Sequence, residues 1–129
     1  MRRLFSRSPD ESFQVTTGEW LLNRLGMIAR MTAHPGRRDA LVECLLDLAR
    51  LAGKAAGCYV YLVHTGTTES DEVWLVEAWR SKVQHDLWLA RPEVQDLIAS
   101  ASELVANASE PIFTEPVGGK GLSSRLAVA

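Results

Sequence analysis

The chain lacks several features on which common functions depend. None of the apolar runs in its 129 residues is long enough to cross a membrane, and its N-terminal arginines precede no apolar stretch of a secretion signal. Fourteen basic residues face sixteen acidic ones, so the formal net charge of -2 provides no basic field for nucleic acid. We therefore expect a cytoplasmic protein with neither membrane nor nucleic acid as partner.

Cysteine and histidine are also scarce. The two cysteines, Cys44 and Cys58, match no metal or redox spacing, which favours two small buried side chains in a reducing compartment. His34 and His64 are expected to end two parallel strands at one sheet edge, without a ligand partner nearby. Because these histidines have no ligand partner, the sequence predicts no metal site. The Gly-Gly-Lys-Gly at 118–121 lies outside a strand-to-helix turn, so no phosphate loop is predicted. No serine or cysteine is marked beside a base, so no nucleophile triad is predicted.

The remaining sequence is patterned as one domain. We expect an N-terminal extension at 1–24, partly mobile, a folded domain at 25–118 and a flexible tail at 119–129. Within the domain, residues 37–52 place Leu41, Leu45, Leu48 and Ala52 on one helical stripe. The expected elements are, in order, a strand at 26–33, that helix, strands at 58–65 and 72–80, a helix from a capping box at Ser81 to about 90, a helix from Pro92 through Val105, and an edge strand at 111–117.

This order is the split βαβ arrangement of a ferredoxin-like α+β fold with an antiparallel sheet, βαββαβ. Both faces of the middle strands carry apolar residues. A sheet with helices on one face should leave its other face wet, so the second apolar face predicts a homodimer formed through sheet faces. The two predicted sets are Cys58, Val60 and Leu62 on one face, and Tyr59, Tyr61 and Val63 on the other.

Three features over residues 26–117 resemble the antibiotic-biosynthesis monooxygenase family. They are the Pro-Gly-Arg-Arg at 35–38, the Glu77-x-Trp79 that closes a strand, and the helix that breaks at 90–92. The resemblance implies a dimeric α+β barrel with a pocket between the sheet and its helices. It also implies relatives that oxidise anthrones or quinols to quinones with neither metal nor flavin, beside relatives with unrelated or unknown activity.

One position departs from the family pattern. Many members carry a histidine that aligns with Trp88, whereas here the histidine is His85, so a role cannot be carried over directly. Trp88 resembles the tryptophan of the haem-degrading branch. Haem degradation is disfavoured, because Ile98 stands near the position of that branch's iron ligand and the first strand offers Arg30 without an asparagine.

A cofactor-free oxygenase needs a base, a group that holds an anion, and dry aromatic walls. The candidate catalytic residues are His85 as the base, Arg30 for an oxyanion, and Trp88. The candidate substrate-binding residues are Trp74, Trp79, Glu77 and Tyr61, with Trp74 and Trp79 on opposite strand faces.

Each candidate has a simpler interpretation. The tryptophans could fill a core or a dimer interface, and His85 could be an exposed helix residue. Arg30 could pair with Glu77 on the adjacent strand.

The sequence therefore predicts a monooxygenase that needs no cofactor and oxidises a small electron-rich aromatic, of the quinol or anthrone type, with molecular oxygen. Two alternatives stay open. One is a binding or interaction module of the same fold with no catalysis. The other is oxygen-independent proton transfer on a small carbonyl compound.

Overall fold

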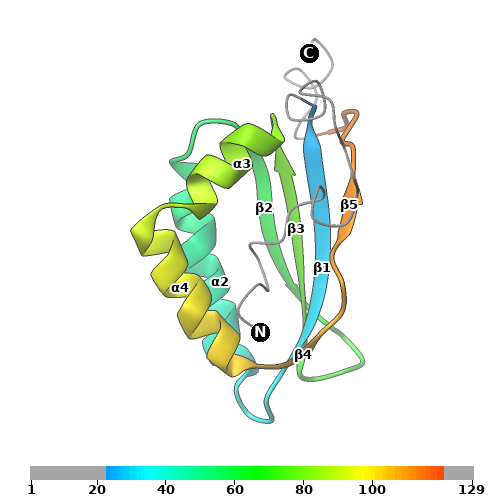
Figure 1. Ribbon diagram of the computed structural model, residues 1–129. Coiled ribbons are helices and arrows are strands. Elements are labelled where there is room, and N and C mark those ends of the chain that lie inside the picture. Colours follow the sequence, from blue (N-terminus) through cyan, green and yellow to red (C-terminus); the bar gives the residue numbers. More distant parts are fainter. Residues whose placement is uncertain (1–22, 121–129) are drawn as a thin grey trace.

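The computed structural model describes residues 23–120, in which helices cover one face of an antiparallel sheet (Figure 1). Predictions for residues 1–22 and 121–129 lie outside the described residues. None of the helices between residues 23 and 120 has the length and apolar character that a membrane crossing requires. The elements are β1 (Leu25–Ala33), α2 (Arg38–Gly53), β2 (Cys58–Thr65), β3 (Glu72–Trp79), α3 (Lys82–Leu89), α4 (Pro92–Leu104), β4 (Val105–Ala108) and β5 (Ile112–Thr114).

The sheet has the strand order β2-β3-β1-β4, and its pairings are antiparallel. β4 and β5 both pair with β1, at opposite ends of that strand, so together they occupy the fourth position of the sheet. This arrangement confirms the predicted ferredoxin-like α+β fold.

The end of the domain differs from the prediction. Val105 was expected in the last helix, but α4 ends at Leu104 and Val105 begins β4, while the final strand is confined to Ile112–Thr114. The amide of His34, the residue after β1, donates a 2.9 Å hydrogen bond to the Leu104 carbonyl where the chain leaves α4. Val105 is buried in the strand as it would be in a helix, and apolar periodicity therefore could not place the boundary.

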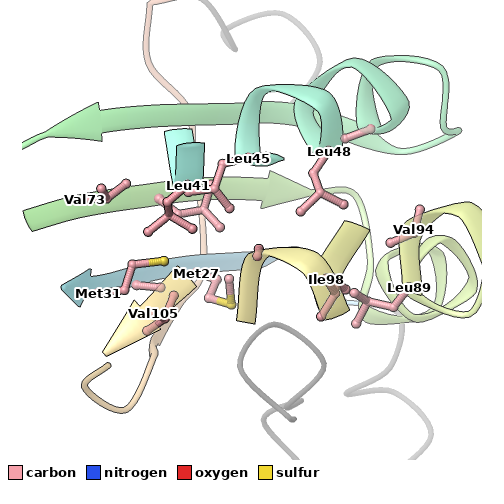
Figure 2. Close-up of a cluster of buried hydrophobic side chains, with 14 of the residues drawn as sticks. Met27, Met31, Leu41, Leu45, Leu48, Val73, Leu89, Val94, Ile98 and Val105 are labelled. Carbon is pink, nitrogen blue, oxygen red and sulfur yellow. The ribbon is translucent and has the colours of Figure 1, made fainter. Parts of the chain in front are cut away.

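The core lies between α2, α4 and the sheet (Figure 2). The predicted stripe of α2 is confirmed, because Leu41, Leu45, Leu48 and Ala52 are all fully buried. Each buried leucine contributes roughly 1.5–3 kcal/mol by leaving water. Alternate residues of β1, including Met27 and Met31, face the same core, so the first strand and the first helix are held together by one apolar layer.

β2 contains an irregularity that corrects one predicted face. Cys58 pairs with Trp79 and Val60 with Ala78, and the register shifts between them. The extra residue turns Cys58 to the helix side, where it packs on the core with Tyr61 and Val63, although it was predicted beside Val60.

The face of the sheet away from the helices, called the outer face below, is apolar along its centre. Cross-strand pairs there join Leu62 to Val76 and Val60 to Ala78. Leu62 keeps 53% of its surface exposed and Ile112 of β5 keeps 58%. The structure therefore bears out the expectation that both faces carry apolar side chains.

Candidate functional site

Five of the seven predicted site residues lie together on the helix side of the sheet. We call Tyr61, Glu77, Trp79, His85 and Trp88 the buried cluster. The Trp79 ring lies 5.3 Å from that of Trp88 and 5.4 Å from that of His85, and Tyr61 meets Trp88 edge-on at 5.6 Å. These side chains come from β2, β3 and α3, which meet near the end of the sheet where β3 finishes (Figure 1).

The start of α3 explains how two cluster residues reach the sheet. The Ser81 hydroxyl accepts a hydrogen bond from the Gln84 amide, which confirms the serine half of the predicted capping box. The side-chain oxygen of Gln84, Oε1, instead accepts a hydrogen bond from Arg80 Nε. From this fixed start, His85 and Trp88 follow three residues apart on one helix face and both turn inward.

His85 is fully buried, with 0% of its surface exposed, so its interpretation as an exposed helix residue was wrong. Its ring packs edge-on against Trp79, and its Nε2 lies 3.8 Å from Glu77 Oε1. The short helix lies on the sheet rather than in solvent at this position. The apolar pattern of α3 could not predict the burial of His85, because histidine occurs both in protein cores and on protein surfaces.

Glu77 is a carboxyl group inside the protein, with 3% of its surface exposed. Tyr61 and Met27 are its neighbours on the adjacent strands, and Trp79 Nε1 donates a 2.8 Å hydrogen bond to Oε1. Burial raises the pKa of Glu77, although the charge of His85 and the bond from Trp79 act in the opposite direction. The site therefore favours a neutral carboxyl group more than water does.

Two further residues belong to this site, and sequence reasoning missed both. His85 Nδ1 lies 3.1 Å from Asp86 Oδ1, and Lys82 Nζ contacts the other oxygen of Asp86. Burial alone would raise the pKa of Asp86, but the hydrogen bonds from His85 and Lys82 prevail and lower it. The spacing of Lys82 and Asp86, four apart on a helix, was a signal that could have revealed their pair.

Two nitrogen atoms of the cluster stand out among the described residues. His85 Nε2 and Trp88 Nε1 are buried and have no hydrogen-bond partner there. Leaving such a group unsatisfied costs roughly 1–3 kcal/mol, and folded proteins rarely keep one without a reason. Trp88 Nε1 can donate a hydrogen bond, and His85 Nε2 can donate or accept one according to its tautomer.

Tyr61 and Cys58 bring two weaker acids to the same neighbourhood from β2. Burial, followed by the nearby charge of Glu77, raises the pKa of Tyr61 well above its ordinary value. The same two causes, in the same order, raise the pKa of Cys58 to about 12. Both groups therefore stay protonated near neutral pH, and Cys58 is no nucleophile.

Arg30 and Trp74 are not brought to the buried cluster. Arg30 stands opposite Trp74 on the outer face, with its guanidinium 5.8 Å from the centre of the indole ring. The proposed pairing of Arg30 with Glu77 was wrong: Arg30 Nη1 lies 3.6 Å from Glu72, because the register aligns Met27 with Glu77.

Metal ligands are not grouped in the described part of the chain. Residues 23–120 contain no set of three or more histidine, cysteine or acidic side chains placed to hold an ion. Cys44 and Cys58 are unpaired and half-buried. The polar groups of the buried cluster are carboxyl, imidazole, phenol and indole groups.

Comparison with known proteins places the chain in a family. The model of the antibiotic biosynthesis monooxygenase family matches residues 24–100. A structure from Chloroflexus aurantiacus J-10-fl, provisionally named an antibiotic biosynthesis monooxygenase, is 38% identical, with 78% of this chain and 100% of that one covered at a TM-score of 0.72. A structure from Caulobacter crescentus CB15, named in the same provisional way, is 19% identical. It covers 77% of this chain and 94% of its own at a TM-score of 0.69, and it shows the shared fold alone.

A search of curated proteins found no match. The family match nevertheless spans more than half of the chain, and the Chloroflexus structure supports it at both the sequence and the fold level. The first helix, the Glu77-x-Trp79 strand end and the short α3 all lie inside the matched range. This chain belongs to the antibiotic biosynthesis monooxygenase family.

Proposed function

We propose that the protein is a monooxygenase that uses no cofactor and oxidises a small electron-rich aromatic, of the quinol or anthrone type, to a quinone. The observation that carries this proposal is the buried cluster, in which two unpartnered nitrogen atoms lie among aromatic rings beside a buried carboxyl group. Family membership supports oxidation of a small molecule, since two similar structures are provisionally named antibiotic biosynthesis monooxygenases.

The chemistry requires the substrate to supply the electrons. A base removes a proton from a phenol or an activated CH₂ group, and the resulting anion passes one electron to oxygen. The substrate radical and superoxide combine to a peroxide, which takes up the proton. At an activated CH₂ group this peroxide loses water as the carbonyl forms, so one oxygen atom enters the product. A quinol already carries both oxygen atoms, so its peroxide releases hydrogen peroxide as the quinone forms, and neither route needs an outside reductant.

The cluster offers a group for each task. His85 Nε2, buried and without a partner, is the base, and Trp88 Nε1 donates to the substrate oxygen as negative charge develops. Tyr61 and Trp79 supply aromatic walls, and Glu77, a carboxyl group whose pKa burial raises, lies beside the base. The exclusion of water keeps each of these interactions strong.

The outer face has a different role in this proposal. Its apolar residues, including Leu62, pack against the same face of a second copy, which gives the predicted homodimer. Arg30 and Trp74 lie on that face, so we assign them to the contact between copies. A mass measurement in solution tests this part of the proposal, and a purely monomeric protein would refute it.

The test of the activity is oxygen uptake with a panel of reduced anthrones and quinols, with and without a chelator. Uptake that survives chelation and yields the quinone is the expected result. Trp88→Phe keeps an aromatic ring but removes the indole donor, and should lower turnover about 100–1000-fold, the effect of losing one transition-state hydrogen bond. Trp74→Phe is the matched control on the outer face and should leave turnover nearly unchanged.

A second candidate function follows from Trp88 itself, which stands where many family members carry a histidine. The same cluster could bind an aromatic ligand through Trp88 Nε1 and His85 Nε2 without any oxidation. This binding module predicts saturable binding, seen as quenching of tryptophan fluorescence, while no product forms under oxygen. Product formation that is equally fast without air would instead indicate isomerase-type proton transfer.

A further inference from the structure

We propose that Asp86, His85 and Glu77 form one buried proton-transfer unit. In this unit Asp86 fixes the imidazole proton on Nδ1, and Nε2 exchanges a proton with the Glu77 carboxyl group. The unit deepens the proposed function and rests on it, because the proton that reaches His85 comes from the substrate of the proposed reaction. It adds Asp86 as a positioning residue and Glu77 as the partner of the base, and its test needs no substrate.

The geometry on the Asp86 side determines where the imidazole proton lies. Nδ1 of His85 is 3.1 Å from Asp86 Oδ1, a hydrogen-bond distance, and a carboxylate can only accept. The ring must therefore donate from Nδ1, which leaves the lone pair of a neutral imidazole on Nε2. Lys82 contacts the other oxygen of Asp86, so the carboxylate is held on both sides.

On the other side, Nε2 faces the Glu77 carboxyl group across a short gap. Glu77 Oε1 lies 3.8 Å away, about 0.6–1 Å longer than a hydrogen bond. Proton transfer requires the two atoms to approach by this difference. Transfer then breaks the O–H bond of Glu77 and forms an N–H bond at Nε2, so a neutral pair becomes a carboxylate beside an imidazolium, with no change of oxidation state.

The surroundings favour exchange over a fixed ion pair. Burial raises the pKa of Glu77, which stabilises its protonated form, while Trp79 Nε1 keeps its carboxyl group in place. The other titratable groups that face Glu77 are Tyr61 and Cys58 of β2, and burial keeps both protonated near neutral pH. In this proposal the pair shares one proton at rest and gains a second when a substrate is deprotonated.

The decisive experiment reads the tautomer of His85 directly. The chain has three histidines, and the double variant His34→Gln/His64→Gln leaves His85 as the only one while changing two exposed positions. Nitrogen-15 NMR of this protein should show neutral His85 with its proton on Nδ1. A proton on Nε2, or a ring that stays doubly protonated over the whole pH range of the folded protein, would overturn the proposal.

Variants in the same background test the two carboxyl groups. Asp86→Ala should shift the proton towards Nε2, whereas Asp96→Ala, an exposed acid of α4, should leave the tautomer unchanged. His85→Gln should raise the pH at which the infrared band of the protonated Glu77 carboxyl group disappears, because the charge of His85 lowers that pKa. An Nδ1 proton that persists without Asp86, or an infrared band that does not move, would contradict the coupling.

These readouts separate the unit from the proposed function. An Nδ1 tautomer with a coupled Glu77, in a protein that consumes no oxygen with any substrate of the panel, would leave the unit standing and refute the oxygenase. Oxygen uptake in a protein whose His85 carries its proton on Nε2 would support the oxygenase and refute the proton-transfer unit.

Discussion

β3 carries the pattern Glu-x-Trp twice, and the two copies face opposite sides of the sheet. Glu72 and Trp74 point to the outer face, where Arg30 lies 3.6 Å from the carboxylate and 5.8 Å from the indole centre. Glu77 and Trp79 point to the helices, where His85 lies 3.8 Å from the carboxyl group and 5.4 Å from the indole centre. Each copy therefore combines an acid, an indole and a basic side chain.

The two copies differ in their contact with water. The side chains of Arg30 and Glu72 are 50% and 20% exposed, so water screens their attraction, whereas those of His85 and Glu77 are 1% and 2% exposed. Burial raises the pKa of Glu77 and leaves a ring nitrogen of His85 without a partner. The same residue types give a surface ion pair on one face and a candidate site on the other.

Removing the two tryptophans should give the largest difference between the faces. Trp79→Ala deletes a fully buried indole and the donor to Glu77, and should lower the free energy of unfolding by about 3–5 kcal/mol. Trp74→Ala removes a half-buried ring and should cost about 1 kcal/mol or less. Urea unfolding at low protein concentration measures both while limiting association through the outer face. Equal losses would show that the outer face is as tightly packed as the core.

The sequence was sufficient to predict the fold and the placement of Trp74 and Trp79 on opposite faces of β3. Apolar periodicity predicted α2, and the order of strands and helices predicted the antiparallel ferredoxin-like sheet. Alternation along β3 also placed Trp74 and Trp79 on opposite faces, and the register confirms this. Val105 was misplaced because burial is required of it in a helix and in a strand alike.

The contacts of the site depend on features that no local pattern records. The register of β1 against β3 gave Arg30 the partner Glu72 rather than Glu77, and a shift of the pairing in β2 turned Cys58 towards the core. Whether α3 lies in solvent or on the sheet decided the burial of His85. Each of these outcomes depends on how distant segments pack, so spacing along the chain could not predict them.

Replacing Glu77 should change how stability depends on pH. Because its pKa is raised, the folded protein binds more protons than the unfolded chain above the ordinary glutamate pKa. The free energy of unfolding of the wild type should therefore fall as the pH rises from that value to the raised one. Glu77→Gln cannot ionise and lacks this fall. It should differ from wild type by about 1 kcal/mol or less in acid and gain relative stability as the pH rises.

Urea unfolding over a pH series measures this difference. Trp79→Phe sharpens the test, because it removes a hydrogen bond that lowers the pKa of Glu77 and should extend the fall in stability to higher pH. If the free energies of unfolding of wild type and Glu77→Gln change in parallel with pH, Glu77 is not desolvated. Its environment would then not differ from that of Glu72 on the outer face.

The smallest effect is expected from the pair on the outer face. Arg30→Ala should lower the free energy of unfolding by about 0–1 kcal/mol at low salt, because the pair with Glu72 is partly exposed and Arg30 also covers Trp74. A double-mutant cycle with Glu72→Ala isolates the pair, and its coupling energy should decline as salt is added, since the screening length is about 10 Å at 0.1 M.

A coupling energy that salt does not reduce would mean that the pair of Arg30 and Glu72 is shielded from water. Association through the outer face would provide that shield, so repeating the cycle at higher protein concentration decides whether a second copy covers Arg30.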